Sequence, residues 1–291
     1  MGNNLLDNLA GYWKLDEAVA TTDPVDAHNG FTLGQNASAA VITGKLNSGR
    51  NMNGRDFSYP STSGTLLDVR QSPMVSWGFS LWVKIITANA VGGTWLIEQY
   101  DSGAGAQGWG CSWRHHTDDT VAVFYLDDQA ATQAVATAAA QTLNDGAWHH
   151  ICGGYDAGNS ELYVSVDGST IETAAVTDPI ETTVTTTDFT VGNNNSFASY
   201  SDHYIDEVGF WNKKLTQLNV DDLNNSGSAL SYDSFTATGT SGAGGPQDTE
   251  YSDPSPFSSR NLEITDHLKA NFLNTADAPA VVNIAYRQVP L

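Results

Sequence analysis

The sequence contains little cysteine and little positive charge. Its 291 residues include only two cysteines, Cys111 and Cys152, too few for a disulfide-rich scaffold or a four-thiolate zinc site. Lysine and arginine total 12, against 33 aspartates and glutamates, which gives a net charge of −21. Such a chain repels nucleic-acid phosphates and anionic membrane surfaces, so we expect no nucleic acid and no membrane among its partners.

Long apolar runs and common catalytic motifs are also missing. No apolar stretch reaches the roughly 18 residues of a membrane helix, and Met1–Ala10 lacks the basic and apolar regions of a secretory signal. The sequence therefore predicts no transmembrane helix and no signal peptide. It also has no Gly-x-Ser-x-Gly elbow, no phosphate-binding loop and no His-Glu-x-x-His pair, which argues against several classes of enzyme.

Short segments with alternating apolar residues are abundant. They are clearest at Phe79–Ile85, Val121–Leu126 and Leu162–Val166. Strands of this kind, with turn residues between them and no long helical pattern, predict an all-β fold, a sandwich of two antiparallel sheets. One short helix is predicted from Thr216 to Leu223. The Ala-rich stretch Ala130–Ala140 fits a helix and a strand about equally well.

The last part of the sequence has a different composition. Thr236–Gln247 is rich in Gly, Ser and Thr, which is typical of a linker, and two strand patterns follow at Leu262–Phe272 and Ala280–Val289. Two strands are too few to fold alone, so they need a surface on which to pack, either a neighbouring subunit or their own sandwich. We therefore divide the chain into a sandwich over 1–231, a Gly/Ser-rich linker over 232–250 and a C-terminal β-arm for docking or assembly over 251–291.

Several motifs occur in a fixed order along the chain. They are Gly11–Glu17 (GYWKLDE), Asp26–Gly30 (DAHNG), Phe79–Lys84 (FSLWVK), Leu143–His150 (LNDGAWHH) and Ile205–Asn212 (IDEVGFWN). Together they resemble a known family, the laminin G-like, concanavalin A-like lectin/glucanase jelly rolls. The resemblance covers about residues 5–230 and implies a jelly roll of two curved sheets, carbohydrate or protein ligands and, often, a bound calcium ion.

Calcium ligands are proposed from the same resemblance. Calcium takes several oxygen ligands, which acidic and Asn-rich loops supply. The candidates are Asp26 and Asn29 in the loop after the first strand, together with Asp206 in a late strand. A carboxylate that only caps a turn explains these positions equally well.

The candidate glycan contacts are polar loop residues, because binding residues are often carried by loops on a rigid scaffold. They are Asn193, Asn194, Asn195 and Tyr200.

Most of the eight tryptophans are assigned to the core, with Trp82, Trp148 and Trp211 expected to be substantially buried. The two cysteines are expected on strands that could be neighbours, as buried free thiols or, alternatively, as a disulfide.

Two conspicuous residue pairs are interpreted as structural. His149 and His150 are adjacent on a strand and should point to opposite faces, so they cannot jointly hold one ion without a bulge. Asp206 and Glu207 are likewise adjacent, which does not match the alternating carboxylates that glucanases present on one strand face. The sequence therefore predicts a protein that is not an enzyme.

These observations favour a non-enzymatic, lectin-like structural or binding protein. A surface or decoration component of a virus particle, such as a phage, ranks first: released by lysis, it needs no signal peptide. Its arm would dock on other virion or surface proteins in an assembled or oligomeric state, and it would bind glycans. The alternatives are a free secreted carbohydrate-binding or adhesion module and, third, a glycoside hydrolase.

Overall fold

The chain divides into two compact units, Met1–Ala243 and Gly244–Leu291. The computed structural model describes residues 3–59, 67, 75–87, 93–101, 107–113, 120–126, 133–139, 142–176, 188–192 and 201–238. All of them belong to the first unit. The predicted β-arm over 251–291 therefore lies outside the described residues.

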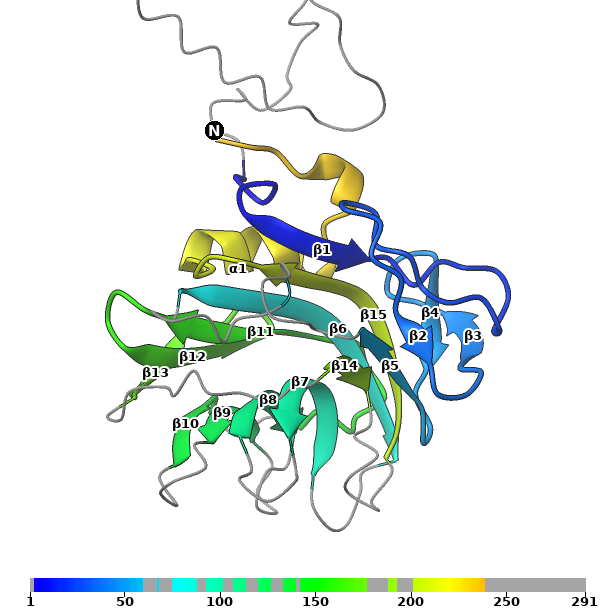
Figure 1. Cartoon of the computed structure of the whole chain (residues 1–291), viewed down its shortest axis with the longest axis horizontal. Coiled ribbons are helices and arrows are strands. Elements are labelled where there is room, and N and C mark those ends of the chain that lie inside the picture. Colours follow the sequence, from blue (N-terminus) through cyan, green and yellow to red (C-terminus); the bar gives the residue numbers. More distant parts are fainter. Residues whose placement is uncertain are drawn as a thin grey trace, which may run out of the picture. The chain divides into compact units, whose positions relative to one another are not determined.

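The described strands form two antiparallel sheets, as the all-β prediction required (Figure 1). The larger sheet has eight strands in the order β13-β12-β11-β6-β15-β4-β3, with β1 paired to β15. Their bounds are β1 (Leu9–Trp13), β3 (Ala40–Thr43), β4 (Ser48–Asn51), β6 (Trp77–Thr87), β11 (His149–Asp156), β12 (Glu161–Val166), β13 (Glu172–Ala175) and β15 (Asp202–Trp211).

The smaller sheet has seven strands in the order β10-β9-β8-β7-β14-β5-β2. Its β10 lies in the Ala-rich stretch, which therefore forms a strand where the structure describes it. The bounds are β2 (Gly34–Gln35), β5 (Asp56–Tyr59), β7 (Thr94–Asp101), β8 (Gln107–Trp113), β9 (Val121–Leu126), β10 (Gln133–Thr137) and β14 (Phe189–Gly192).

The main core fills the space between the two sheets. Alternate residues of β6 point into it, and so do alternate residues of β8, because successive side chains of a strand lie on opposite faces. The inward set includes Trp77, Phe79, Trp109 and Cys111, all fully buried. The rings of Trp77 and Trp109 come within 4.3 Å of each other, centroid to centroid. Strand alternation thus predicted this core correctly.

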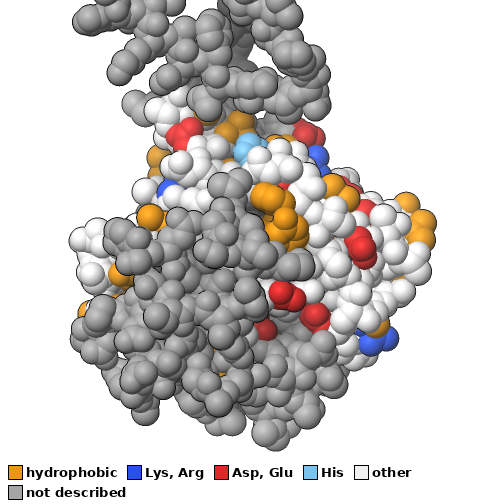
Figure 2. Space-filling view, viewed as in Figure 1, with side chains coloured by type: hydrophobic (Ala, Val, Ile, Leu, Met, Phe, Trp, Pro, Cys, Tyr) orange, Lys and Arg blue, Asp and Glu red, His pale blue; other side chains and the backbone are white. Residues whose placement is uncertain are grey.

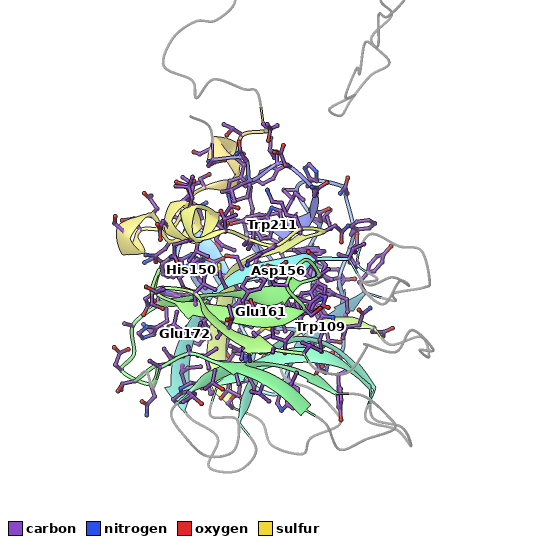
Figure 3. All side chains as sticks on the ribbon, turned by 90° about the vertical axis from the view of Figure 1, so that its left-hand side faces the viewer. Trp109, His150, Asp156, Glu161, Glu172 and Trp211 are labelled. Carbon is purple, nitrogen blue, oxygen red and sulfur yellow. The ribbon has the colours of Figure 1, made fainter. Side chains whose placement is uncertain are left out.

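A second apolar cluster covers part of the opposite face of the larger sheet, here called the outer face. Helix α1 (Gln217–Asn224) lies on this side (Figure 1), and its N-cap is Thr216, where the sequence placed the start of the helix. Asn219 completes a capping box with Thr216. Trp211 belongs to this cluster and donates its indole N–H to the Leu5 carbonyl at 2.7 Å. In Figure 3, Trp211 and His150 lie on the helix side, whereas Trp109 lies nearer the smaller sheet.

The sandwich continues past residue 231, where the sequence placed the start of a linker. The short turns η2 (Asn225–Gly227) and η3 (Tyr232–Ser234) return the chain towards the N-terminus. There the Leu6 N–H donates to the Thr236 carbonyl at 3.0 Å, and Phe235 packs in the second cluster at 6% exposure. Residues 232–238 are therefore part of the sandwich, because an aromatic residue in this segment fills a gap on the outer face.

One prediction about buried residues needs correction. Trp82 and Trp211 are buried as expected, and Trp148, directly before β11, is half-buried. Cys111 and Cys152 are buried free thiols, the preferred interpretation, yet they lie on β8 and β11 in different sheets and so are not on neighbouring strands.

The described part of the chain has few basic side chains on the face drawn and no helix suited to a membrane. On the face drawn in Figure 2, lysine and arginine side chains are few and lie apart from one another. Within the described part of the chain, no helix has the length and apolar character needed to cross a membrane.

Candidate functional site

The first predicted calcium ligand, Asp26, is a buried anchor for backbone amides. Its Oδ1 accepts hydrogen bonds from the N–H of Tyr12 at 2.6 Å and of His28 at 2.8 Å, and its Oδ2 accepts one from the N–H of Asn29 at 2.6 Å. The Asn29 side-chain amide donates to the Ala10 carbonyl at 2.8 Å. Asp26 and Asn29 therefore join the loop after β1 to β1 itself.

Asp206 holds a different loop. Its Oδ2 accepts hydrogen bonds from the N–H groups of Lys45 at 2.7 Å and Leu46 at 3.0 Å, in the turn between β3 and β4. Gly44 is required there, because a Cβ at this position would lie 2.5 Å from the same oxygen. Asp206 Oδ1 accepts from the N–H of Glu207 at 3.0 Å. Both oxygens of this fully buried carboxylate are thus satisfied by backbone donors.

The three predicted ligands are engaged by two different loops, and calcium binding by them stays a prediction. Asp26 and Asn29 belong to one hydrogen-bonded loop, and Asp206 is occupied by another. Among the described residues, no group of three or more His, Cys, Asp or Glu side chains could hold a metal ion. The turn-capping interpretation, which the sequence left open, describes the observed role of Asp26 and Asp206.

Glu207 follows Asp206 in a β-bulge of β15. The register with β6 shifts between Asp206 and Gly209, and Glu207 adopts a left-handed backbone with φ of 50°. Burial raises the pKa of Glu207 to about 7, and the nearby Tyr12 hydroxyl opposes that rise. Burial also raises the pKa of Asp206, while its backbone donors stabilise the carboxylate. Glu207 is only 3% exposed, so neither carboxyl group faces a substrate-accessible surface in this structure.

The two adjacent histidines have different environments, in line with the structural interpretation. His150 is fully buried on the outer face, with Nε2 2.8 Å from Ser80 Oγ, and burial lowers its pKa to about 3. His149 lies between two exposed carboxylates, with Nδ1 2.8 Å from Asp167 Oδ2 and Nε2 3.0 Å from Asp145 Oδ1. The bond to Asp167 is the main reason that the pKa of His149 is raised.

The loop residues proposed as glycan contacts, Asn193, Asn194, Asn195 and Tyr200, lie outside the described residues. What the structure does describe is a row across the outer face, here called the exposed row because each of its members is partly accessible. It is made of Trp148, Lys84, Tyr204 and Asn51, all half-buried. The rings of Trp148 and Tyr204 have centroids 6.5 Å apart. Sequence reasoning missed this row because it placed Trp148 in the core.

Comparison with known proteins identifies the family. Residues 59–221, more than half of the chain, match the family described as the concanavalin A-like lectin/glucanases superfamily. The chain belongs to this superfamily. A comparison with curated proteins found no match.

Solved structures similar to this superfamily member come from enzymes and toxins. Domain 4 of AbnA, a GH43 extracellular arabinanase from Geobacillus stearothermophilus solved with arabinotriose, is 16% identical with a TM-score of 0.55; the match covers 77% of this chain and 98% of that domain. The binding domain of Paraclostridial Mosquitocidal Protein 1 is 14% identical, with a TM-score of 0.57 and coverage of 76% and 52%. Trypanosoma rangeli sialidase in complex with sialic acid is 14% identical, with a TM-score of 0.52 and coverage of 77% and 34%.

These similarities show the fold alone. The chain spans about half the length of the toxin domain and about a third of the sialidase. The shared architecture is a lectin-like β-sandwich, which is found both in binding domains and in parts of glycoside hydrolases.

We predict that Asp206→Asn destabilises the protein by about 1–3 kcal/mol, because an amide offers one acceptor oxygen in place of two and leaves buried N–H donors unpaired. The free energy of unfolding in urea measures this loss. Asp233→Asn is the matched control, since Asp233 is 76% exposed and should change stability by no more than about 0.5 kcal/mol. Equal effects for the two variants would contradict the anchoring role of Asp206.

A pH-dependent contribution is expected from His149. Because its folded pKa is raised above 6.5, its contribution to stability is fully present below pH 6.5 and is lost as pH rises through the folded pKa. The difference in free energy of unfolding between the protein and His149→Gln should therefore be largest in mild acid and shrink towards alkaline pH. A difference that stays constant across this range would contradict a stabilising contact between protonated His149 and the carboxylates of Asp145 and Asp167.

Proposed function

We propose that the chain is a non-enzymatic, lectin-like protein that binds glycans. The observation that carries the proposal is the family fold combined with the burial of the Asp206 and Glu207 carboxyl groups. These are the most conspicuous carboxyl pair of the family motifs, and they are buried among backbone donors and core residues. A glycosidase instead needs two carboxyl groups that flank the bond to be cleaved.

Similar structures support the choice of ligand. The arabinanase domain was solved with an oligosaccharide, and two other similar structures are binding domains of botulinum neurotoxins, one of them in complex with rat synaptotagmin II. Binding is therefore a role that similar structures have both in an enzyme and in toxins. Carbohydrate is favoured over nucleic acid as a ligand by the net charge of −21.

A polysaccharide microarray tests this function directly. The full chain should bind at least one of the printed arabinan, xylan, β-glucan, mannan, alginate and sialylated glycans, and should release no reducing sugar from soluble forms of the same polymers. Hydrolysis of any of them would favour the glycoside hydrolase alternative, and the absence of binding to all of them would contradict the proposed function.

The proposed place of action is the surface of a virus particle, where the segment 251–291 would dock on neighbouring proteins. Its support is the sequence of that segment, with two strand patterns after a Gly-rich stretch. A free carbohydrate-binding or adhesion module is the alternative.

Truncation after Thr238 separates these two possibilities, because the described sandwich ends at this residue. The truncated chain should keep the thermal stability of the sandwich but lose incorporation into particles or oligomers. A large drop in the melting temperature of the truncated monomer would instead show that the arm belongs to its own sandwich.

A further inference from the structure

The second apolar cluster and the β3–β4 turn, here called the cover, lie over only part of the outer side of β6. Alternate residues of this strand point to the outer face, and they become more exposed along the chain. Gly78 packs against Leu215 and Tyr163, and Trp82 is 3% exposed beneath Lys45, whose Nζ is 4.2 Å from the ring centroid. Lys84 is half-buried and Ile86 is 40% exposed. Among the described residues, the second apolar cluster and the β3–β4 turn thus cover β6 only as far as Trp82.

Strand register brings the exposed row together just beyond Trp82. Tyr204 of β15 pairs with Lys84 of β6 on one side and with Asn51 of β4 on the other. His149 pairs with Val83, so continuation of this antiparallel register places Trp148 opposite Lys84. Side chains in one cross-strand row share a face of the sheet, and the ring contact between Trp148 and Tyr204 agrees with that placement.

Trp148 differs from every other tryptophan of the chain. All eight tryptophans fall within the described residues, and the other seven are at most 5% exposed. Burial of an indole removes a large apolar area from water and is strongly favourable. Trp148 is therefore the one tryptophan of this fold whose indole stays partly accessible, and it lies beside the partly accessible ring of Tyr204.

The polar groups of the row are available as well. The structure gives Lys84 no hydrogen bond, ion pair or ring contact, whereas every other lysine and arginine in the described part of the chain has at least one. In the same part of the chain, the Tyr204 hydroxyl and the Trp148 indole N–H have no hydrogen-bond partner either. The side-chain oxygen Oδ1 of Asn51 accepts a hydrogen bond from the Asn53 N–H at 2.9 Å, which leaves the side-chain NH₂ group of Asn51 as a donor.

We propose that the exposed row binds a pyranose unit of a glycan, with the apolar C–H face of the sugar on the Trp148 and Tyr204 rings. The sugar hydroxyls would accept hydrogen bonds from the Lys84 ammonium and the Asn51 amide. This inference rests on the proposed lectin-like function and assigns it a site on the outer face, made of residues other than the loop positions Asn193 to Asn195.

The combination of aromatic rings with an ammonium and an amide group favours a sugar over an apolar protein surface as the ligand. A purely apolar partner would bury the lysine ammonium and the amide without hydrogen bonds, which is costly. A pyranose offers both an apolar face and hydroxyl acceptors within one ring, so it satisfies both kinds of group. Ligand sites in proteins commonly combine aromatic side chains with a few placed polar groups in this way.

Neighbouring structure holds the row in position. His149 joins Asp145, at the start of the turn that carries Trp148, to Asp167 after β12. Asp206 holds Lys45 and Leu46 beside the covered end of the row. These contacts fix Trp148 and the edge of the cover before a ligand arrives, which lowers the entropic cost of binding.

The polysaccharide microarray described above, read with variants of the full chain, tests this site. Trp148→Ala and Tyr204→Ala should each weaken binding to the spots that the unmodified chain recognises by at least about tenfold in apparent Kd. Trp148→Phe should retain more binding than Trp148→Ala, because it keeps an aromatic face. Lys84→Met should also weaken binding, and circular dichroism with thermal melting would show whether each variant is folded.

The control variants separate this site from other surfaces. Leu218→Ala removes a 60% exposed apolar side chain on α1 and should not change binding. Bound spots that are unaffected by the Trp148 and Tyr204 variants would overturn the inference and leave the proposed function standing, and a loss of binding in Asn194→Ala alone would place the site in the loop. Failure of the unmodified chain to bind any spot would contradict both.

Discussion

Asp206, the residue before the bulge in β15, links the larger sheet to the turn that covers part of its outer face. One extra residue at Glu207 changes the register with β6 while Asp206 keeps its place opposite Trp82. Its buried carboxylate then meets the N–H groups of the β3–β4 turn, and that turn brings Lys45 over the indole of Trp82. A carboxylate in this position must be satisfied by donors, because an unpaired buried charge is costly. The turn supplies those donors and in doing so closes the outer face as far as Trp82.

The same geometry takes up several polar side chains inside the sandwich. The carboxyl groups of Asp206 and Glu207 are used to organise the sandwich, and the buried His150 bonds to Ser80 in the neighbouring strand. Lys84, the Tyr204 hydroxyl and the Trp148 indole N–H have no hydrogen-bond partner in the described part of the chain, and they are suited to contact with a sugar. The fold therefore uses its ionisable residues for structure and leaves aromatic surface at one edge.

Local sequence patterns predicted the architecture well. Strand alternation identified the inward face of β6 and β8, and the Thr216 cap located α1, because both depend on residues close together in the chain. The strands of Cys111 and Cys152 were judged possible neighbours, and that was wrong because sheet membership depends on strand order. Residues 232–238 were assigned to a linker for a similar reason: the gap that Phe235 fills is formed by β1 and β15, far away in the sequence.

The candidate site was less predictable than the fold. The carboxylates of Asp26 and Asp206 were singled out correctly as important, but the sequence could not show that backbone N–H groups occupy them. Trp148 was placed in the core because its motif is dominated by buried residues, and its exposure depends on where the β3–β4 turn ends. The position of Trp148 at the end of a turn, directly before β11, was the one available signal.

Fluorine NMR of the full chain labelled with 5-fluorotryptophan tests the central claim most directly, since the eight tryptophans give separate probes of the core and the outer face. Each resonance can be assigned with a single Trp→Phe variant. The account predicts that the Trp148 resonance alone shows a large H₂O/D₂O solvent shift, and that it alone moves when a polysaccharide bound on the microarray is added in soluble form. A solvent-shielded Trp148, or ligand-induced changes confined to other tryptophans, would contradict it.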